Sequence, residues 1–337
     1  MGTNGDSNRW SWQAQAAEGV IPLRLAPAFK DYLWGGQRLR REFGKKTDMN
    51  PLAESWELSC HEAGLCVIEN GPFAGRALRD YLREYPQHLS AGADAGAEFP
   101  LLIKLIDAEQ MLSVQVHPDD AYARRVENAS GKTEMWYVVD AKPGAGIYYG
   151  FREAVTRNEM AEAIRSKTLT SMLNWVQAQK GDVFFIPSGT IHAIGAGLLV
   201  AEVQQNSNIT YRMWDYGRIG ADGKPRELHI EKGLDVTVRE HRGPTLPYEP
   251  DREVPGGRVR HLVRCERFCV DVIHLCGLIE DYAAAASFVS LLCLEGEGAL
   301  LWGESAMPLK KGQSVFVPAG LGGFKLAGMM EILRTTL

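Results

Sequence analysis

A short internal repeat places the strongest constraint on how this chain can fold. Residues 181–194, GDVFFIPSGTIHAI, align without a gap with residues 312–325, GQSVFVPAGLGGFK. Both copies begin at a Gly turn, continue as an apolar run of β type, and then turn again at a Pro and a Gly. Two copies of one β-unit predict a protein made of two related β-domains.

Short runs of β type that end at Gly, Pro or Asp fill most of the remaining chain, and they indicate antiparallel sheets. In the first two thirds they are SWELS, CVIEN, LLIKLID, LSVQVH, MWYVV, GIYYG, VFFIP and LLVAEVQQ; in the last third they are RFCVDVIHL, SFVSLLCLEGEGALLW, GQSVFVPAG and MMEILRT. Apolar residues at helical spacing interrupt this pattern in residues 77–89 and 153–177. We therefore predict a mainly β protein with helical insertions in its N-terminal half.

The length and composition suit two packed units. The chain has 337 residues, of which 45% are hydrophobic, and this is more than one small core requires. A tract rich in Pro, Gly and charge, residues 241–258, separates the two copies of the repeat. We predict a mobile tail over residues 1–20, a first domain over residues 21–240 and a second domain over residues 241–337.

Charge and cysteine usage limit the possible partners and the compartment. The net charge is −5 without long blocks of like charge, which argues against nucleic acid and membrane surfaces as partners. The six cysteines form no CxxC pair, and neither a secretory leader nor a membrane-spanning stretch is evident. We expect a cytoplasmic protein, a monomer or a homodimer, that acts on a small molecule.

Four side chains of the first domain are candidates for a metal site. Gln115 and His117 stand two residues apart on a run of β type, so both project from the same face of a strand. Glu134 begins the strand of MWYVV, and His192 lies in the first copy of the repeat. Each residue alone is more often a core or capping side chain, but together they offer the nitrogen and oxygen donors that a borderline divalent cation takes.

The first copy of the repeat also fits a known barrel motif. Gly181, Pro187, Gly189 and His192 follow the spacing G-x5-P-x-G-x2-H, which resembles the second sequence motif of the cupin β-barrels, although the final Asn of that motif is absent. Where the first copy has His192, the second has Gly323. We therefore expect a single metal site, in the first domain, and a degenerate second domain without metal ligands.

A wider set of segments resembles the type I mannose-6-phosphate isomerases, in particular their short bacterial form. The segments are DYLWGG, AESWELS, SVQVHPDD, GKTEMWY, IPSGTIHAI and NITYRMWDYGR. Their order and spacing match over most of residues 22–240, and the remainder resembles the degenerate second barrel of that family. The resemblance implies two cupin barrels, that is, jelly-roll or double-stranded β-helix domains.

The resemblance also implies a zinc ion and a set of site residues. Zinc ligands of the family map to Gln115, His117, Glu134 and His192, although some short bacterial members carry Lys in place of Gln115. Three further active-site residues of the family map to Lys132, Glu202 and Arg212. The implied reaction interconverts mannose 6-phosphate and fructose 6-phosphate through a cis-enediolate, which zinc would stabilise as a Lewis acid.

The residues leave several alternatives open. Glu202 and a metal-linked water compete for the role of base, and Arg212 suits either an oxyanion or the phosphate. Lys132 could instead be a solvated turn residue, and Arg212 could be the buried partner of Asp215 or Glu202. The alternative functions are a cupin-type metal oxygenase and a non-catalytic sugar-phosphate-binding protein.

Overall fold

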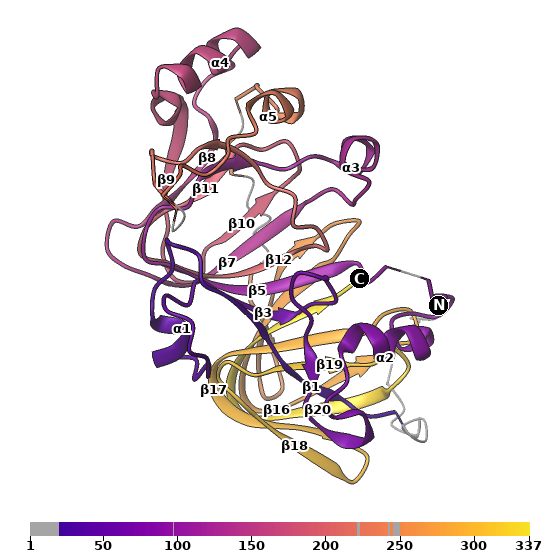
Figure 1. Ribbon diagram of the computed structural model, residues 1–337. Coiled ribbons are helices and arrows are strands. Elements are labelled where there is room, and N and C mark those ends of the chain that lie inside the picture. Colours follow the sequence, from indigo (N-terminus) through magenta and orange to yellow (C-terminus); the bar gives the residue numbers. More distant parts are fainter. Residues whose placement is uncertain (1–19, 97, 221–222, 242, 245–249) are drawn as a thin grey trace, which may run out of the picture.

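The computed structural model describes residues 20–96, 98–220, 223–241, 243–244 and 250–337. Apart from residue 20, the predicted N-terminal tail lies outside the described residues. The described chain is mainly β, as predicted, and its strands form three antiparallel sheets (Figure 1). No described helix has both the length and the apolar character needed to cross a bilayer.

Two of the sheets form the first barrel. The six-stranded sheet has the order β10-β7-β12-β5-β3-β2, with bounds Val183–Ile186, Glu134–Ala141, Leu198–Gln205, Leu101–Ala108, Glu54–Leu58 and Ala28–Lys30. The five-stranded sheet has the order β13-β6-β11-β8-β9, with bounds Tyr211–Trp214, Val114–Val116, His192–Ile194, Gly146–Phe151 and Leu173–Gln177. All the strands predicted in the first two thirds of the chain belong to these two sheets, except CVIEN.

A nine-stranded sheet forms the second barrel. Its order is β14-β15-β16-β20-β17-β19-β1-β4, and β18 pairs with β17. The bounds in this order are Arg252–Val254, Gly257–Arg264, Cys269–Ala283, Gly322–Thr336, Val289–Trp302, Ser314–Val317, Leu23–Ala26 and Val67–Ile68, and β18 spans Ser305–Lys310. Strands β1 and β4 come from the N-terminal part of the chain, so the second sheet draws strands from both sides of the predicted boundary.

The internal repeat of the sequence is also a repeat of structure. Strand β10 of the first barrel corresponds to β19 of the second, and β11 corresponds to the beginning of β20. Gly181 and Gly312, which open the two copies, have φ angles of 89° and 81°. Gly189 and Gly320, at the following turn, have φ angles of 83° and 78°. Because L side chains rarely adopt this backbone region, both turns depend on glycine.

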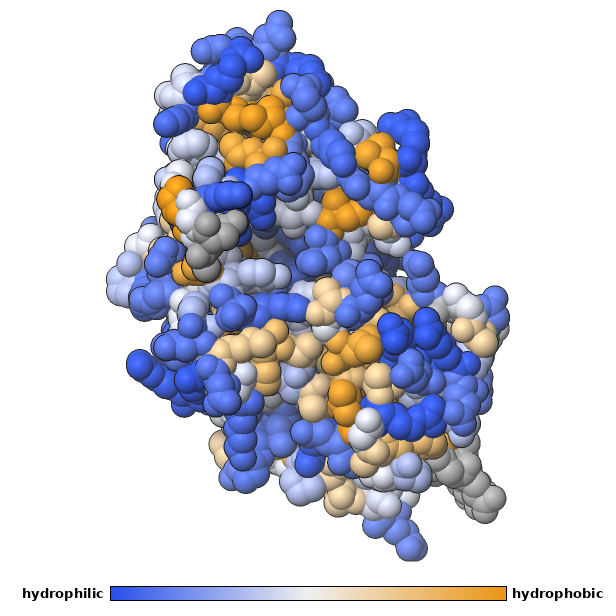
Figure 2. All heavy atoms as spheres, in the orientation of Figure 1, coloured by the Kyte–Doolittle hydropathy of each residue, from blue (hydrophilic) through white to orange (hydrophobic). Residues whose placement is uncertain are grey.

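The helices lie beside the barrels and are short. They are α1 (Arg38–Arg41), α2 (Leu78–Glu84), α3 (Asp120–Glu127), α4 (Arg157–Arg165) and α5 (Ile230–Val236), with 3₁₀ turns at Gly71–Phe73, Pro86–His88 and Leu169–Met172. In Figure 2, apolar residues gather between α4 and α5 and again over the lower part of the molecule, with hydrophilic residues around them.

The prediction of a helix over residues 153–177 was only partly correct. Helix α4 ends at Arg165, Lys167 has a left-handed φ of 61°, and the segment finishes as strand β9. Strand β9 pairs with β8, so Trp175 lies opposite Tyr148. Sheet pairing at the barrel edge overrides the apolar spacing, which by itself does not distinguish a short strand from a helix.

The six-stranded sheet lies between the second barrel and the interior of the first. Along β7, Met135 and Tyr137 belong to a core cluster that also contains Phe288 and Phe316 of the second barrel. Trp136, between them, belongs to a different core cluster inside the first barrel. Successive residues of a strand point to opposite faces, so this one sheet supports both cores.

The two turn glycines of the repeat provide a matched test of backbone and packing effects. A Cβ atom at Gly189 would lie 2.9 Å from the carbonyl oxygen of Val236, whereas one at Gly320 would meet nothing within 4 Å. We expect Gly320→Ala to lower the free energy of unfolding by about 1–2 kcal/mol through backbone strain alone. Gly189→Ala should cost roughly a further 1 kcal/mol or more because of the clash. Urea unfolding of both variants measures the difference, and equal losses would contradict it.

Candidate metal centre and active site

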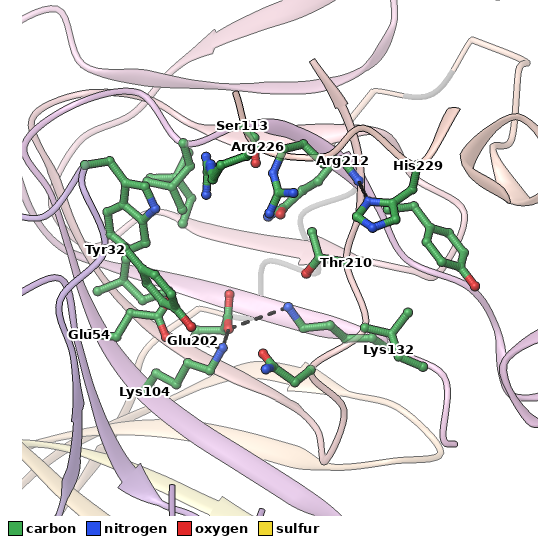
Figure 3. Close-up of a pocket in the computed structure, with 18 of the residues that line it drawn as sticks. Tyr32, Glu54, Lys104, Ser113, Lys132, Glu202, Thr210, Arg212, Arg226 and His229 are labelled. Atoms are coloured by element: carbon green, nitrogen blue, oxygen red, sulfur yellow. Dashed lines mark hydrogen bonds and ion pairs between the residues drawn. The ribbon is translucent and has the colours of Figure 1, made fainter. Parts of the chain in front are cut away.

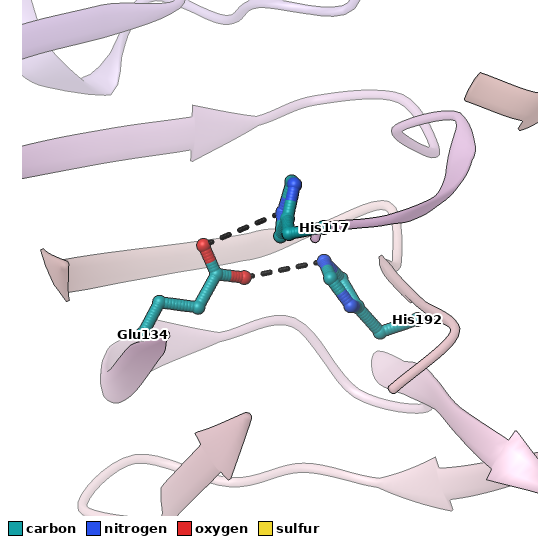
Figure 4. A group of neighbouring side chains, drawn as sticks. All are labelled: His117, Glu134 and His192. Carbon is teal, nitrogen blue, oxygen red and sulfur yellow. Dashed lines mark ion pairs between the residues drawn. The ribbon is translucent and has the colours of Figure 1, made fainter. Parts of the chain in front are cut away.

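Three predicted metal ligands converge inside the first barrel (Figure 4). His117 directly follows β6, Glu134 is the first residue of β7, and His192 is the first residue of β11. The Glu134 carboxylate lies between the two imidazoles, with Oε1 3.2 Å from His192 Nε2 and Oε2 3.6 Å from His117 Nε2. All three side chains are buried, and their possible ligand atoms lie within 4.8 Å of one another.

The backbone orients both imidazoles. Nδ1 of His117 lies 2.9 Å from the carbonyl oxygen of Ile209, and Nδ1 of His192 lies 2.8 Å from that of Thr190. A carbonyl oxygen only accepts, so in each ring Nδ1 carries the proton and Nε2 presents its lone pair toward Glu134. Burial lowers the pKa of His117 to about 4, which keeps its ring in the neutral form that binds metals.

The donor atoms fit a divalent cation. Oε1 of Glu134 and Nε2 of His192 are buried without a hydrogen-bond partner in the described part of the chain, whereas Oε2 of Glu134 pairs with the Lys132 ammonium. Burial alone would raise the pKa of Glu134, but the neighbouring Lys132 ammonium holds it well below its usual range, so the carboxylate is ionised. Burying lone pairs of this kind without a partner is unfavourable unless a cation binds them, so this group could hold a metal ion.

Gln115 lies next to this group, half-buried on β6. It stands opposite His192 in the pairing of β6 with β11 and opposite Arg212 in the pairing with β13. Its side chain lines the neighbouring cavity. Its role as a ligand stays a prediction.

Lys132 is a buried residue of the site and not a solvated turn residue. Its Nζ lies 2.6 Å from Oε2 of Glu134 and 3.3 Å from Nε2 of His117. The same atom is 3.8 Å from Oε1 of Glu202. This ammonium group therefore connects the metal group to the carboxylate of Glu202.

Glu202 belongs to a row of side chains that crosses four strands of the six-stranded sheet. In the strand register it stands between Trp136 of β7 and Lys104 of β5, and Lys104 stands opposite Trp56 of β3. Oε1 of Glu202 is 3.1 Å from Nζ of Lys104, and Oε2 accepts a hydrogen bond of 2.8 Å from Trp136 Nε1. Both oxygens of this buried carboxylate therefore face a cation or an N–H donor.

Lys104 and Glu54 are site residues that the sequence analysis missed. Lys104 is almost fully buried, and its Nζ lies 3.7 Å from Oε2 of Glu54. Burial alone would lower the pKa of Lys104, but Glu54 and Glu202 raise it above its usual value, so the ammonium is charged. The one available signal was the lysine within the apolar run LLIKLI.

A cavity of about 430 Å³ lies beside the metal group (Figure 3). Lys104, Lys132 and Glu202 line one side, and Arg212 and Arg226 lie together on the opposite side. Further lining residues are Tyr32, Trp34, Glu54, Ile106, Leu112, Ser113, Gln115, Glu127, Ile194, Asn208, Ile209, Thr210, Tyr211, His229 and Lys232. The cavity thus joins the predicted residues Lys132, Glu202 and Arg212 into one site.

Arg212 is not the buried ion-pair partner that the sequence left possible. Asp215 instead contacts Arg218 and Arg226, and Glu202 is held by lysines. The one hydrogen bond from the Arg212 guanidinium to a described residue runs from Nη1 to the carbonyl oxygen of Glu227, over 2.8 Å. Burial, and then Arg226, lower the pKa of Arg212 from its ordinary value.

Known proteins match almost the whole chain. Residues 22–147 match the family model of the phosphomannose isomerase type I catalytic domain, and residues 258–337 match the cupin domain of mannose-6-phosphate isomerase. The mannose-6-phosphate isomerase ManA of Bacillus subtilis is 39% identical over 94% of this chain and 99% of its own length. The mannose-6-phosphate isomerase of Streptococcus mutans is 35% identical over 93% of this chain and 98% of its own. The chain belongs to the type I phosphomannose isomerase family.

Solved structures agree with this membership. The crystal structure of the mannose 6-phosphate isomerase from Bacillus subtilis gives a TM-score of 0.88 at 35% identity, and it covers 94% of this chain and 99% of that one. A variant of phosphomannose isomerase from Salmonella typhimurium shares the fold, with a TM-score of 0.74 at 19% identity. The predicted fold of two cupin barrels with helical insertions is therefore confirmed.

Strand register shows which residues of the second barrel occupy the positions of the predicted metal ligands. In the first barrel Ile186 pairs with Glu134, and the equivalent residue Val317 pairs with Val289. Glu134 therefore corresponds to Val289, and His192 corresponds to Gly323. Neither residue of the second barrel carries a donor side chain, which supports the prediction of a single metal site.

His192 and Gly323 offer a matched pair for testing the metal centre. We expect His192→Ala to weaken metal binding by more than about 100-fold, because one of the convergent nitrogen ligands is lost. Gly323→Ala should leave metal content unchanged. Elemental analysis of each protein after reconstitution and dialysis gives the metal per chain. Equal metal loss from the two variants would refute the assignment to the first barrel.

Proposed function

We propose that this protein is a zinc-dependent aldose–ketose isomerase that interconverts mannose 6-phosphate and fructose 6-phosphate. The observation that carries the proposal is the contact of Lys132 with both the metal group and Glu202 at the edge of a cation-lined cavity. The names of the curated relatives supply the substrate. We further propose that it works in the cytoplasm as a monomer or a homodimer.

His117, Glu134 and His192 would hold the zinc ion, with Gln115 as a fourth ligand. The set of imidazole nitrogens and carboxylate or amide oxygens suits zinc, although it does not exclude other divalent transition metals. When bound, zinc would supply Lewis acidity that lowers the energy of negative charge on the sugar oxygens.

The remaining residues can perform the proton transfers. Isomerisation moves a proton between C2 and C1 through a cis-enediolate, and it needs a base near both carbons. We assign this role to Glu202, because it lines the cavity and its Oε1 lies 3.1 Å from Nζ of Lys104 and 3.8 Å from Nζ of Lys132. Lys132 would move protons between the hydroxyl and carbonyl oxygens, and Lys104 would hold Glu202 in place.

Arg212 would bind negative charge on the substrate. Its Nε is buried without a partner among the described residues, so it has donor capacity for the phosphate or for an oxyanion. Cations on two sides of the cavity favour an isomerase of sugar phosphates over a cupin-type oxygenase. A non-catalytic sugar-phosphate-binding protein would not require Lys132 in contact with the metal group.

Dependence on metal is the first test of this function. Purified protein loaded with zinc should convert mannose 6-phosphate into fructose 6-phosphate, and removal of the metal by a chelator should abolish the conversion. Zinc added back should restore it. A coupled assay for fructose 6-phosphate follows the reaction, with oxygen uptake measured in parallel. Absence of turnover with zinc bound, or turnover that survives complete metal removal, would refute the proposal.

Glu202 and Glu54 form a matched pair for testing the base, because both carboxylates lie near Lys104 and line the cavity. Glu202→Gln should lower kcat by about 10²–10⁴-fold, since an amide cannot accept the proton. Exchange of the C2 hydrogen with solvent deuterium should fall in parallel. Glu54→Gln should lower kcat far less. If both variants lose activity equally, Glu202 is not the base.

A further inference from the structure

The second barrel has a cavity of its own, with a volume of about 630 Å³. Its lining residues come from β14, β15, β16 and β20 and from the turn at Pro255, so it is separate from the cavity beside the metal group. Apolar side chains form much of its wall, among them Val254, Val259, Ile273 and Ile279. Charged side chains gather in the same cavity, and strand register explains how they come to lie there.

Arg334 of β20 occupies the position that Glu202 has in the first barrel. Glu202 stands opposite Trp136 of β7, and Arg334 stands opposite Leu291 of β17. Trp136 and Leu291 are each the third residue of their strand, and the first residues of these two strands correspond to each other. Both Glu202 and Arg334 line the cavity of their own barrel.

Asp271 of β16 likewise occupies the position of Lys104. Lys104 stands opposite Glu202 on β5, and Asp271 stands opposite Arg334 on β16. Ile106 and Ile273, each two residues further along, also line the two cavities. The second barrel therefore repeats the cavity and the ion pair of the first, but with the two charges exchanged and without the metal ligands.

The contacts of these charged groups leave one carboxylate oxygen with spare capacity. Arg334 donates to both oxygens of Asp281, from Nε over 2.6 Å and from Nη2 over 3.1 Å. Oδ1 of Asp271 accepts from Nδ1 of His261. Among the described residues, Oδ2 of Asp271 contacts only Nη1 of Arg334, over a long 3.4 Å. This oxygen can accept a further hydrogen bond, and Asp271 is only 9% exposed.

The charges and the wall of the cavity together define the ligand. The carboxylates of Asp271 and Asp281 share the guanidinium of Arg334, and all three side chains are mostly buried. Arg252 and Glu280, which also line the cavity, are exposed, opposite in charge and screened by water. The buried end therefore carries excess negative charge and an open acceptor, which a cationic donor complements. The apolar wall complements a hydrocarbon body and leaves a polyhydroxylated ligand without partners for its hydroxyls.

We propose that the cavity of the second barrel is a binding site for a small organic ammonium ion with an apolar body. The ammonium group donates to Oδ2 of Asp271, and the body packs against Val259, Ile273 and Ile279. A buried ion pair adds little to stability compared with apolar residues of the same volume, so its presence beside an open cavity favours a role in binding. No residue of the first barrel takes part, so this site and the proposed isomerase function can be tested separately.

Three ligands with the same body and different head groups test the chemistry of the site. They are the cyclohexylammonium ion, cyclohexanol and cyclohexanecarboxylate, titrated at neutral pH into the zinc-loaded full-length protein and followed by ligand-observed NMR. We expect the ammonium ion to bind about 10-fold or more tightly than the alcohol, because a hydrogen bond to a charged group is the stronger one. The carboxylate should bind least. Equal affinity for the ammonium ion and the alcohol, or tighter binding of the carboxylate, overturns the proposal.

Three variants place the binding in the second barrel. Asp271→Asn removes the charge and keeps the shape, so it should weaken binding of the ammonium ion by about 10-fold. Glu280→Gln makes the same change at the exposed rim and should alter the affinity less than about twofold. Val259→Phe should abolish binding of the ammonium ion and of the alcohol, because the larger ring fills the space opposite Ile273.

Circular dichroism checks that each variant is folded, and if Asp271→Asn does not fold, Val259→Phe decides the outcome. Binding that survives Val259→Phe overturns the proposal, as does an equal loss in Asp271→Asn and Glu280→Gln. Loss of binding in Asp271→Asn and Val259→Phe, with binding kept in Glu280→Gln, supports it. Isomerisation of mannose 6-phosphate by the same protein samples is a separate measurement, so either result can fail while the other stands.

Discussion

The buried ion pair of Glu202 with Lys104 is the interaction on which the arrangement of the site depends. Both side chains are almost fully buried on the inner face of the six-stranded sheet, at positions that strand register places directly opposite each other. A buried charge is tolerated when it is paired and hydrogen-bonded, and loss of one partner costs about 3–5 kcal/mol. Trp136 and Trp56 flank the pair on the neighbouring strands. Lys132 extends this charged row to the metal group, so sheet register fixes how far the proposed acid–base residues lie from the predicted metal ligands.

The second barrel explains how this register stays rigid although the barrel has no ligands of its own. Its aromatic residues Phe288 and Phe316 pack in one cluster with Leu105 and Met135, which lie on the outer face of the same sheet. Strand β1 crosses from the first part of the chain to pair with β19. Val289 and Gly323, which stand where the first barrel has the predicted ligands Glu134 and His192, leave the interior of the second barrel free for apolar packing. The degenerate copy thus serves as a second layer behind the six-stranded sheet.

Sequence reasoning was reliable where a local signal determines the outcome. The turn glycines of the repeat have left-handed φ angles, and the expected ligands His117, Glu134 and His192 meet as the motifs predicted. Prediction from sequence failed where a residue or strand takes its place by pairing with a partner far away in the chain. Lys104 and Glu202 are neighbours only through register, and a lone lysine in an apolar run gives no hint of its partner. Residues 173–177 were assigned to a helix because a local pattern does not show that they pair with strand β8.

Charge balance within the cavity explains why an anionic substrate suits this chain, which is itself acidic overall, with a net charge of −5. Three of the cavity carboxylates already have lysine partners: Glu54 and Glu202 contact Lys104, and Glu127 contacts Lys232. The guanidinium of Arg212 has no such partner among the described residues, and a metal ion beside Lys132 would add further positive charge. A confined cavity with unbalanced cations focuses its field on an entering anion, and this attraction is strongest where low-dielectric walls exclude water. An anion that enters the cavity is therefore drawn toward the unpaired guanidinium of Arg212, across the cavity from Glu202.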